Sequence, residues 1–209
     1  MQITVFGATG RTGVPLVRQA LDRGHDVVAF ARSPEKLPVE DSALTVVEGD
    51  AYGGDGVAEA IAGADAVVSV LGQTAEGPDD LLTVAGDNVL AAMREAGVER
   101  FVTLVGAGVR EAGEDVSLSG KAMGVLLKLF AADVLDDAAE HVRRVGATDL
   151  DWTVVRAPRL TDGAGTGEYR AGDVDLGFES VARADVARFV LDCVEDDLYV
   201  GELPKVGAA

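Results

Sequence analysis

The sequence predicts an α/β protein in which helices cover both faces of a doubly wound parallel β-sheet. Three observations indicate this fold. Short apolar runs alternate with helical patterns, the runs are continuous rather than alternating with polar residues, and a glycine-rich loop joins the first run to the first helix. The chain has 209 residues, 48% of them hydrophobic and 26% charged, which suits one globular α/β domain and excludes a disordered or fibrous protein.

Six apolar runs predict the strands, in the order Ile3–Phe6, Val27–Phe30, Leu44–Val47, Ala66–Leu71, Phe101–Val105 and Trp152–Val155. Their continuous apolar character is typical of central parallel strands that are covered on both faces. Between them, helical patterns are found at Val14–Arg23, Asp55–Ala62, Asp79–Ala96 and Ala184–Val194. The first three patterns each stop at a glycine, which is a common residue just beyond a helix end.

Two segments do not fit this alternation. Residues 106–135 are long for a connection, and residues 156–183 are rich in glycine and charge. Both follow the carboxyl ends of predicted strands, where open α/β sheets bind their ligands. We therefore expect one domain, residues 1–209, with these two segments forming a small substrate lobe.

The chain is strongly acidic, with 18 Lys and Arg against 36 Asp and Glu and a net charge of −18. Such a surface repels phosphate backbones and anionic lipids, so we expect no nucleic-acid partner and no membrane partner. Only four of the basic residues are lysines, and low lysine with excess acid is typical of salt-accumulating halophiles. A merely acidic cytosolic protein is the alternative.

Cysteine usage and the amino terminus favour the cytoplasm. Cys193 is the only cysteine and cannot form an internal disulfide, which suits a reducing compartment. The first residues have no basic region of a signal peptide, and the longest apolar stretch, residues 122–132, is too short to span a bilayer. We expect a cytoplasmic monomer or weak homodimer with a small-molecule partner. We expect no metal site, since no His/Cys/Asp cluster has ligand spacing.

The loop after the first strand predicts a phosphate-binding site. Residues 7–13 read Gly-Ala-Thr-Gly-Arg-Thr-Gly between a strand and a helix. Gly7 permits the tight turn, Gly10 lets backbone amides approach a pyrophosphate, and Gly13 allows close packing of helix and strand. The amino end of the helix adds free N–H groups and a positive dipole. A glycine-rich turn without a ligand is the alternative; the predicted contacts are Gly7, Ala8, Thr9, Gly10, Arg11 and Thr12.

The end of the second strand favours NADP(H) over NAD(H). An NAD site usually carries an acidic residue there for the ribose 2′-hydroxyl, whereas this chain has Arg32 and Ser33. The Arg32 guanidinium suits a 2′-phosphate, and Lys36 lies close enough in sequence to add a second positive charge. A solvated surface arginine is the alternative.

Further loops at the same sheet edge supply candidate contacts. After the third strand, Asp50 is a candidate acceptor for the adenine amino group, although a plain turn aspartate is an equal alternative. After the fourth strand, Gly72 would let the chain pass the ribose and the pyrophosphate. After the fifth strand, Gly106 is expected below the nicotinamide.

These segments resemble the atypical short-chain dehydrogenase/reductases, a Rossmann-fold group. The resemblance rests on GATGRTG, FARSPEKL, VVEGDA and LDWTVVRAPRLTDGAGTGEYR, and it is closest to the NAD(P)H-binding, NmrA-like branch that includes flavin reductase/biliverdin-IXβ reductase. It implies pyrophosphate contacts from the glycine loop and 2′-phosphate contacts from Arg32 and Lys36. It also implies that Asp50 and Ala51 lie at the adenine, Leu71 and Gly72 at the ribose, and Ala157, Pro158, Arg159 and Leu160 at the nicotinamide and the substrate.

Two departures from the group bear on the chemistry. Flavin reductases of this branch carry a serine where this chain has Gly106, and none of the three tyrosines (Tyr52, Tyr169, Tyr199) is followed four residues later by the lysine of the usual Tyr-x-x-x-Lys pair. Reduction of a carbonyl needs a nearby proton donor, whereas a flavin or quinone can take hydride and be protonated by solvent. The missing pair therefore favours NADPH-dependent reduction of a flavin, a quinone or a similar acceptor.

Two other functions remain open. A non-catalytic NADP(H)-binding regulator, as NmrA-like relatives are thought to be, would need no acid or base. A sugar-nucleotide epimerase or reductase would need the missing tyrosine and lysine.

A few further side chains are weaker candidates for the chemistry. Arg159 and Lys121 are the catalytic candidates. Arg159 would hold an anionic substrate group, and the alternative is a surface ion pair. Lys121 would assist the substrate together with Ser119, and the alternative is a solvated lysine. His141 and His25 are expected to be structural or exposed. The apolar run at residues 125–130 predicts helix core rather than a substrate lid.

Overall fold

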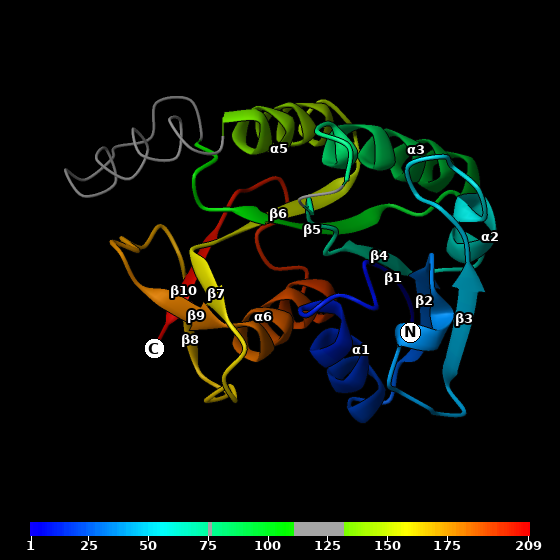
Figure 1. The fold of residues 1–209 in the computed structure, drawn as a ribbon, viewed down its shortest axis with the longest axis horizontal. Helices are drawn as coiled ribbons and strands as arrows, with labels where there is room; N and C mark the ends of the chain where they lie inside the picture. The colour runs from blue at the N-terminus through cyan, green and yellow to red at the C-terminus, as the bar shows by residue number, and fades with distance from the viewer. Residues whose placement is uncertain (75–76, 111–131) are drawn as a thin grey trace.

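The computed structural model describes residues 1–74, 77–110 and 132–209, which form three layers with a β-sheet in the middle (Figure 1). Along the sheet the strand order is β3-β2-β1-β4-β5-β6-β10-β8. The first six strands in the chain pair in parallel: β1 (Gln2–Phe6), β2 (Asp26–Ala31), β3 (Leu44–Glu48), β4 (Ala66–Ser69), β5 (Arg100–Gly106) and β6 (Asp151–Ala157). The predicted doubly wound α/β class is confirmed.

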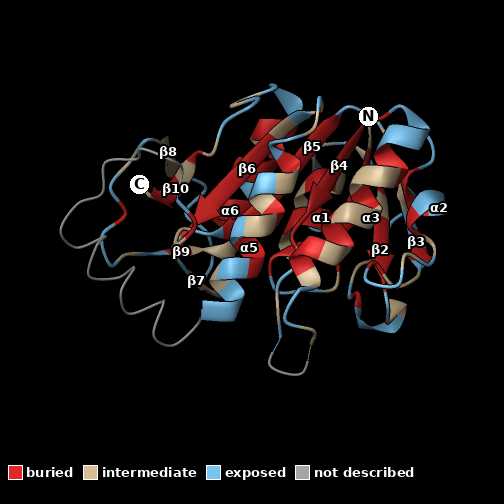
Figure 2. Cartoon of the chain, turned by 90° about the horizontal axis from the view of Figure 1, so that it is seen from above, coloured by how far each residue is buried: buried red, intermediate tan, exposed pale blue. Residues whose placement is uncertain are grey.

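Helices cover both faces of the sheet. On one face lie α1 (Gly13–Asp22) and α6 (Arg183–Glu195); on the other lie α2 (Val57–Ile61), α3 (Leu81–Ala96) and α5 (Ala132–Val145) (Figure 1). Each face has its own apolar cluster, one centred on Leu16 and Phe189 and the other on Phe101 and Met93. Figure 2 shows that burial is concentrated in the strands and in the helix surfaces turned toward them.

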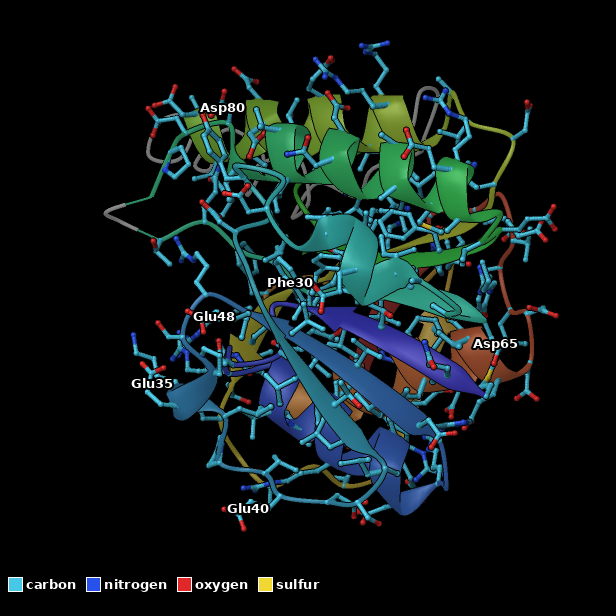
Figure 3. All side chains as sticks on the ribbon, turned by 90° about the vertical axis from the view of Figure 1, so that its right-hand side faces the viewer. Phe30, Glu35, Glu40, Glu48, Asp65 and Asp80 are labelled. Carbon is cyan, nitrogen blue, oxygen red and sulfur yellow. The ribbon has the colours of Figure 1, made fainter. Side chains whose placement is uncertain are left out.

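Several predicted boundaries were wrong by a few residues. The fourth strand ends at Ser69 rather than Leu71, and the second helix is short, starting at Val57 rather than Asp55. The third strand is not a covered central strand but an edge strand, on which Thr45, Val46 and Glu48 are exposed. Figure 3 looks onto this edge, with Glu48 at the end of β3. Only the buried side of such a strand needs apolar residues, so an apolar run does not distinguish an edge strand from a central one.

The carboxyl-terminal part contains elements that the sequence patterns did not reveal. Strand β10 (Lys205–Ala208) pairs in parallel with β6, and β8 (Tyr169–Gly172) pairs antiparallel with β10. A separate two-stranded ribbon joins β7 (Arg159–Thr161) to β9 (Ser180–Ala182). Within the predicted lobe, residues 132–135 belong instead to α5, and β8 is part of the main sheet, while residues 111–131 lie outside the described residues.

Over the described ranges, no helix combines the length and the apolar content that crossing a bilayer requires.

Candidate functional site

The glycine loop makes a tight turn between β1 and α1. Gly7 has φ +81°, a conformation that L side chains rarely adopt, and a Cβ there would lie 2.9 Å from the carbonyl carbon and oxygen of Val70. The Gly10 amide donates to the Gly7 carbonyl at 2.9 Å and closes the turn. The loop is therefore folded back against the end of β4, as the motif predicts.

Gly13 explains how α1 starts so close to the strand. A Cβ on Gly13 would lie 2.1 Å from the Gly7 carbonyl oxygen and 2.7 Å from Cα of Ala8, so no larger residue fits. Thr12, at the amino-terminal cap of α1, makes no capping hydrogen bond through its side chain. The amino end of α1 thus presents an uncapped dipole, which is the feature that binds phosphate in such loops.

Open space lies over the neighbouring strand ends. Gly72 follows β4 and Gly106 ends β5, and β1, β4 and β5 are adjacent in the sheet. A Cβ at Gly72 or Gly106 would meet no described atom within 4 Å. The structure therefore has a packed turn at Gly7 and Gly13 beside an uncrowded edge at Gly72 and Gly106, which is the shape that an elongated dinucleotide needs.

Arg32 and Lys36 lie four residues apart, just beyond the end of β2. Arg32 follows the strand directly, and a single 3-10 turn (Pro34–Lys36) brings the Lys36 amide to 3.1 Å from the Ser33 carbonyl. Both cationic side chains are exposed, and neither has an acidic partner among the described residues. In a chain of net charge −18, two cations without acidic partners at a strand end are suited to hold an anion.

Arg11 of the glycine loop forms an ion pair with Asp162, which lies in the predicted substrate lobe. Its guanidinium donates to Asp162 at 3.1 Å, and the other carboxylate oxygen of Asp162 accepts from Arg183 at 2.6 Å. Asp162 follows β7, and Arg183 opens α6. Sequence reasoning missed this link because its members lie far apart in the chain.

Asp50 takes part in the turn after β3. Its Oδ1 accepts from the Tyr52 amide at 3.2 Å, and its carbonyl accepts from the Gly54 amide at 2.8 Å. The neighbouring Ala51 is buried, and its carbonyl accepts from Asn88 of α3 at 2.9 Å. The turn aspartate alternative is thus present, and the adenine contact stays a prediction.

A buried carboxylate supports the loop after β4. Asp137 of α5 accepts from the amides of Leu82 and Thr83 at 2.9 Å each, at the start of α3, and from Gln73 Nε2 at 2.6 Å. Asp137 therefore caps α3 from another helix and ties the loop containing Leu71 and Gly72 to it. Nothing in the local sequence marks this role, because the partners lie on α3 and on the loop after β4, far from Asp137 in the chain.

The two histidines have structural surroundings. His141 is 2% exposed, and its Nε2 lies 3.1 Å from Thr103 Oγ1. Burial lowers its pKa to about 4, so the ring is neutral near pH 7. Gly86 of α3 leaves room for the ring, since a Cβ there would lie 2.4 Å from His141 Nδ1. His25 Nε2 lies 2.5 Å from Glu195 Oε1 on the surface between α1 and α6.

The predicted nicotinamide end is formed where β5 and β6 finish. Ala157 lies opposite Gly106 in the sheet register, and its carbonyl accepts from the Ala107 amide at 2.7 Å. Pro158 and Leu160 are half-buried, and Arg159 between them is exposed. Ser119, Lys121 and the apolar run at 125–130 lie outside the described residues.

The tyrosines have partners away from this edge. Tyr169 OH donates to Asp192 on α6 at 2.6 Å, and burial together with that carboxylate raises the Tyr169 pKa above its ordinary range. Tyr52 OH donates to Asp80 at 3.0 Å beside α3, and Tyr199 packs edge-on against Phe189. None of the three is placed as a proton donor at Gly106.

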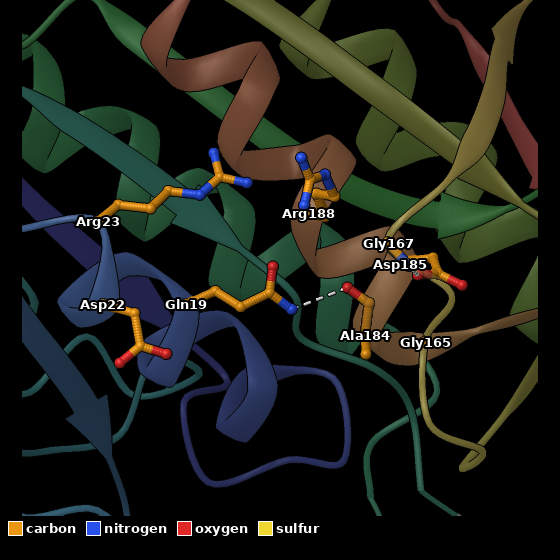
Figure 4. A pocket seen from close by; sticks show the side chains of 8 residues that line it. All are labelled: Gln19, Asp22, Arg23, Gly165, Gly167, Ala184, Asp185 and Arg188. Atoms are coloured by element: carbon orange, nitrogen blue, oxygen red, sulfur yellow. Dashed lines mark hydrogen bonds between the residues drawn. The ribbon is translucent and has the colours of Figure 1, made fainter.

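One described cavity, of about 280 Å³, lies between α1 and α6 (Figure 4). Gln19 crosses it to donate to the Ala184 carbonyl at 2.9 Å, and Arg23 and Arg188 approach it from the two helices. It contains none of the predicted cofactor contacts. Among the described residues, no group of three His, Cys, Asp or Glu side chains is placed to hold a metal ion.

Comparisons with known proteins agree with this geometry. Residues 7–197 match a family described as NAD(P)H-binding. The uncharacterized protein YwnB of Bacillus subtilis is 30% identical over 97% of this chain and 96% of its own length. A 3-beta-hydroxysteroid dehydrogenase of Mycolicibacterium neoaurum is 35% identical over 55% of this chain but only 34% of its own.

The fold is shared with solved structures. ChuY, an anaerobilin reductase of Escherichia coli O157:H7, superposes with a TM-score of 0.79 at 22% identity, covering 99% of this chain and 96% of that one. At this identity the likeness shows a common fold.

Proposed function

Because the chain belongs to the NAD(P)H-binding family, which matches residues 7–197, we propose that it is an NADPH-dependent oxidoreductase that transfers hydride to a flavin, a quinone or a similar small acceptor. The observation that carries this proposal is the sheet edge just described. A packed glycine turn with an uncapped helix start lies beside open space at Gly72 and Gly106.

The residues present fit the cofactor. The loop at 7–13 and the start of α1 would hold the pyrophosphate through backbone amides, because the glycines leave no side chain in the way. Arg32 and Lys36 would hold the 2′-phosphate, which is the basis for preferring NADP(H) over NAD(H). Gly72 and Gly106 would let the ribose and the nicotinamide lie against backbone.

The protein's part in the reaction is alignment. A nicotinamide held there would supply a hydride to the two-electron acceptor, and water would supply the accompanying proton. The residues around Gly106 and Ala157 would need only to hold the cofactor and the acceptor next to each other and to keep the approach open. This role is compatible with the neutral, buried His141 and with tyrosines that are engaged elsewhere.

A direct assay tests the proposal. The purified protein is mixed with NADPH and, in separate samples, with FMN, riboflavin and simple quinones in molar KCl, and the loss of nicotinamide absorbance is followed. We expect turnover with at least one acceptor and a lower KM for NADPH than for NADH. Failure of both nicotinamides to bind in calorimetry would overturn the proposal.

A non-catalytic NADP(H) sensor is the second candidate. It is favoured by one observation, the Asp162 bridge that connects the glycine loop to the lobe and to α6. Tight NADPH binding without turnover on any acceptor would favour it. An epimerase has less support, since no tyrosine lies at the nicotinamide end of the described structure.

A further inference from the structure

The cavity between α1 and α6 is lined by two arginines whose N–H groups are only partly used (Figure 4). Arg188 of α6 is exposed and has no hydrogen-bond or ion-pair partner among the described residues. Arg23, at the end of α1, pairs with Asp192 at 2.7 Å and with Glu195 at 2.5 Å, but both contacts go through Nη1. The Nε and Nη2 groups of Arg23 therefore have no acceptor in the described part of the chain.

A glycine-rich loop forms one wall of the cavity and holds the carboxylate of Asp185. Asp185 is buried and accepts from the amides of Thr166 and Gly167 at 3.1 and 2.9 Å. A Cβ at Gly165 would lie 2.5 Å from Asp185 Oδ1, so the loop approaches this carboxylate closely only because residue 165 is glycine. Asp185 is thus occupied by backbone donors and does not pair with Arg188.

The other carboxylates near the two arginines also have donors of their own. Asp192 accepts from Tyr169 OH at 2.6 Å, and Glu195 Oε1 lies 2.5 Å from His25 Nε2. Asp22 points away from both guanidinium groups in the close view (Figure 4). The cavity therefore contains guanidinium donors that no carboxylate of the described residues satisfies.

The cavity is sized for a small ligand. Its volume of about 280 Å³ lies just below the range of roughly 300–1,000 Å³ that is usual for sites of drug-sized ligands, so a dinucleotide does not fit. Gln19 donates to the Ala184 carbonyl at 2.9 Å across the cavity. This hydrogen bond ties α1 to α6 and fixes the spacing of the two helices that carry the arginines.

We propose that the cavity is a second ligand site, in which Arg188 and Arg23 bind the phosphate group of a small molecule or of inorganic phosphate. A guanidinium forms paired hydrogen bonds to phosphate oxygens. Two guanidinium groups match a phosphate group, whose charge is between about −1.5 and −2 at pH 7. The site is separate from the nucleotide edge, because none of the predicted cofactor contacts lines the cavity.

Calorimetric titration of three anions tests the site. The protein is first titrated with NADP⁺ and then kept saturated with it, so that the glycine loop is blocked, at constant ionic strength and at the lowest KCl concentration that keeps the protein folded. Inorganic phosphate, glycerol 3-phosphate and acetate are then added separately. We expect a Kd of about 1 mM or lower for at least one of the two phosphate compounds and a Kd for acetate at least about tenfold higher. Tighter binding of glycerol 3-phosphate would assign the site to a phosphate ester, and tighter or equal binding of phosphate would assign it to the free ion.

Two variants remove the site by different means. Arg188→Ala deletes an exposed side chain without protein partners, so it should leave the Tm unchanged and raise the Kd for phosphate at least about tenfold. Ala184→Leu keeps the net charge and places a larger apolar side chain against the cavity, and it should weaken phosphate binding to a similar extent. Thermal unfolding of each variant shows whether it is folded.

A matched control is Arg94→Ala. Arg94 is an exposed arginine in the last turn of α3, on the opposite face of the sheet from α1 and α6, so its removal changes the net charge by the same amount and should leave the Kd for phosphate unchanged (Figure 1). Absence of phosphate binding in the wild type, a Kd that is unchanged in Arg188→Ala, or an equal loss in Arg94→Ala would overturn the site. The initial NADP⁺ titration reports on the nucleotide site alone, so failure of the proposed function is distinguishable from failure of this second site.

Discussion

Asp162 holds Arg11 of the glycine loop through one carboxylate oxygen while its other oxygen accepts from Arg183. The Arg11 and Asp162 side chains are 73% and 60% exposed, so the pair contributes at most about 1 kcal/mol. A cofactor pyrophosphate would compete with Asp162 for the Arg11 guanidinium, because both are anions. Arg183 would keep Asp162 paired after Arg11 leaves.

Asp162→Asn is therefore expected to tighten NADPH binding. The variant removes a competing anion from beside the phosphate site, and we expect the Kd to fall by about two- to fivefold. Nicotinamide fluorescence titration measures the change. Asp173→Asn, which removes a similar exposed carboxylate paired with Lys205, is the control and should leave the Kd unchanged. Weaker binding in Asp162→Asn would show that Asp162 positions Arg11 rather than competing for it.

Arg32→Ala is expected to discriminate between the two nicotinamide cofactors. Loss of a charge-assisted contact to the 2′-phosphate should weaken NADPH binding by about 1.5–3 kcal/mol and barely change NADH. Arg32 is exposed and unpaired in the described structure, so the variant should unfold at the same temperature as the wild type. Equal losses for both cofactors would remove the 2′-phosphate assignment.

Substitution by alanine should lower the stability of the protein at Gly13 and its affinity for NADPH at Gly72. Gly13→Ala places a Cβ 2.1 Å from the Gly7 carbonyl oxygen, and we expect the free energy of unfolding to fall by about 3 kcal/mol. Gly72→Ala meets nothing within 4 Å, so stability should stay within about 0.5 kcal/mol of the wild type. The Kd for NADPH should nevertheless rise about tenfold in Gly72→Ala, because the cofactor would occupy that space. Urea unfolding and NADPH titration of both variants test this pair, and unchanged NADPH binding in Gly72→Ala would contradict the assignment.

His141 should make stability depend on pH below neutrality. Burial lowers its pKa from 6.5 to about 4, so between these values the unfolded chain binds a proton that the folded chain does not. Stability is therefore fully present above pH 6.5 and falls toward pH 4, by roughly 3 kcal/mol for this group alone. The comparison is between urea unfolding of the wild type and of His141→Gln from pH 7.5 to 5. The variant should be less stable at every pH, but its free energy of unfolding should depend less steeply on pH. Equal pH dependence in the two proteins would exclude His141 as the cause.

Salt should stabilise the protein. Repulsion within a chain of charge −18 is weakly screened at 0.1 M salt, where the Debye length is about 10 Å, and strongly screened at molar concentrations. We expect the Tm in circular dichroism to rise by at least about 10 °C between 0.1 M and 3 M KCl. A flat or falling Tm would favour the ordinary acidic protein over the halophile.

Some of the site was predictable because its signals are local. The glycines at 7, 10 and 13 lie between a strand and a helix. At Gly7 and Gly13 a Cβ would collide with backbone atoms, whereas at Gly10 it would lie 3.1 Å from the Gly7 carbonyl oxygen, a tight contact that a small shift relieves. Arg32 follows β2 directly, so its place at the sheet edge followed from the strand prediction. Asp137, Asp162 and Gly86 were missed, because their partners come from other elements and the sequence around each is unremarkable.

The sequence by itself determined the layered α/β architecture, the parallel strands β1 to β6 and the tight glycine turn after β1, because hydrophobic period and glycine spacing act over a few residues. Only the tertiary structure decided that β3 is an edge, that the last residues of the chain add β10 next to β6, and that β7 and β9 pair as a separate ribbon. Those outcomes depend on which distant segments pair, and short strands such as Lys205–Ala208 are stabilised by their neighbours rather than by their own sequence.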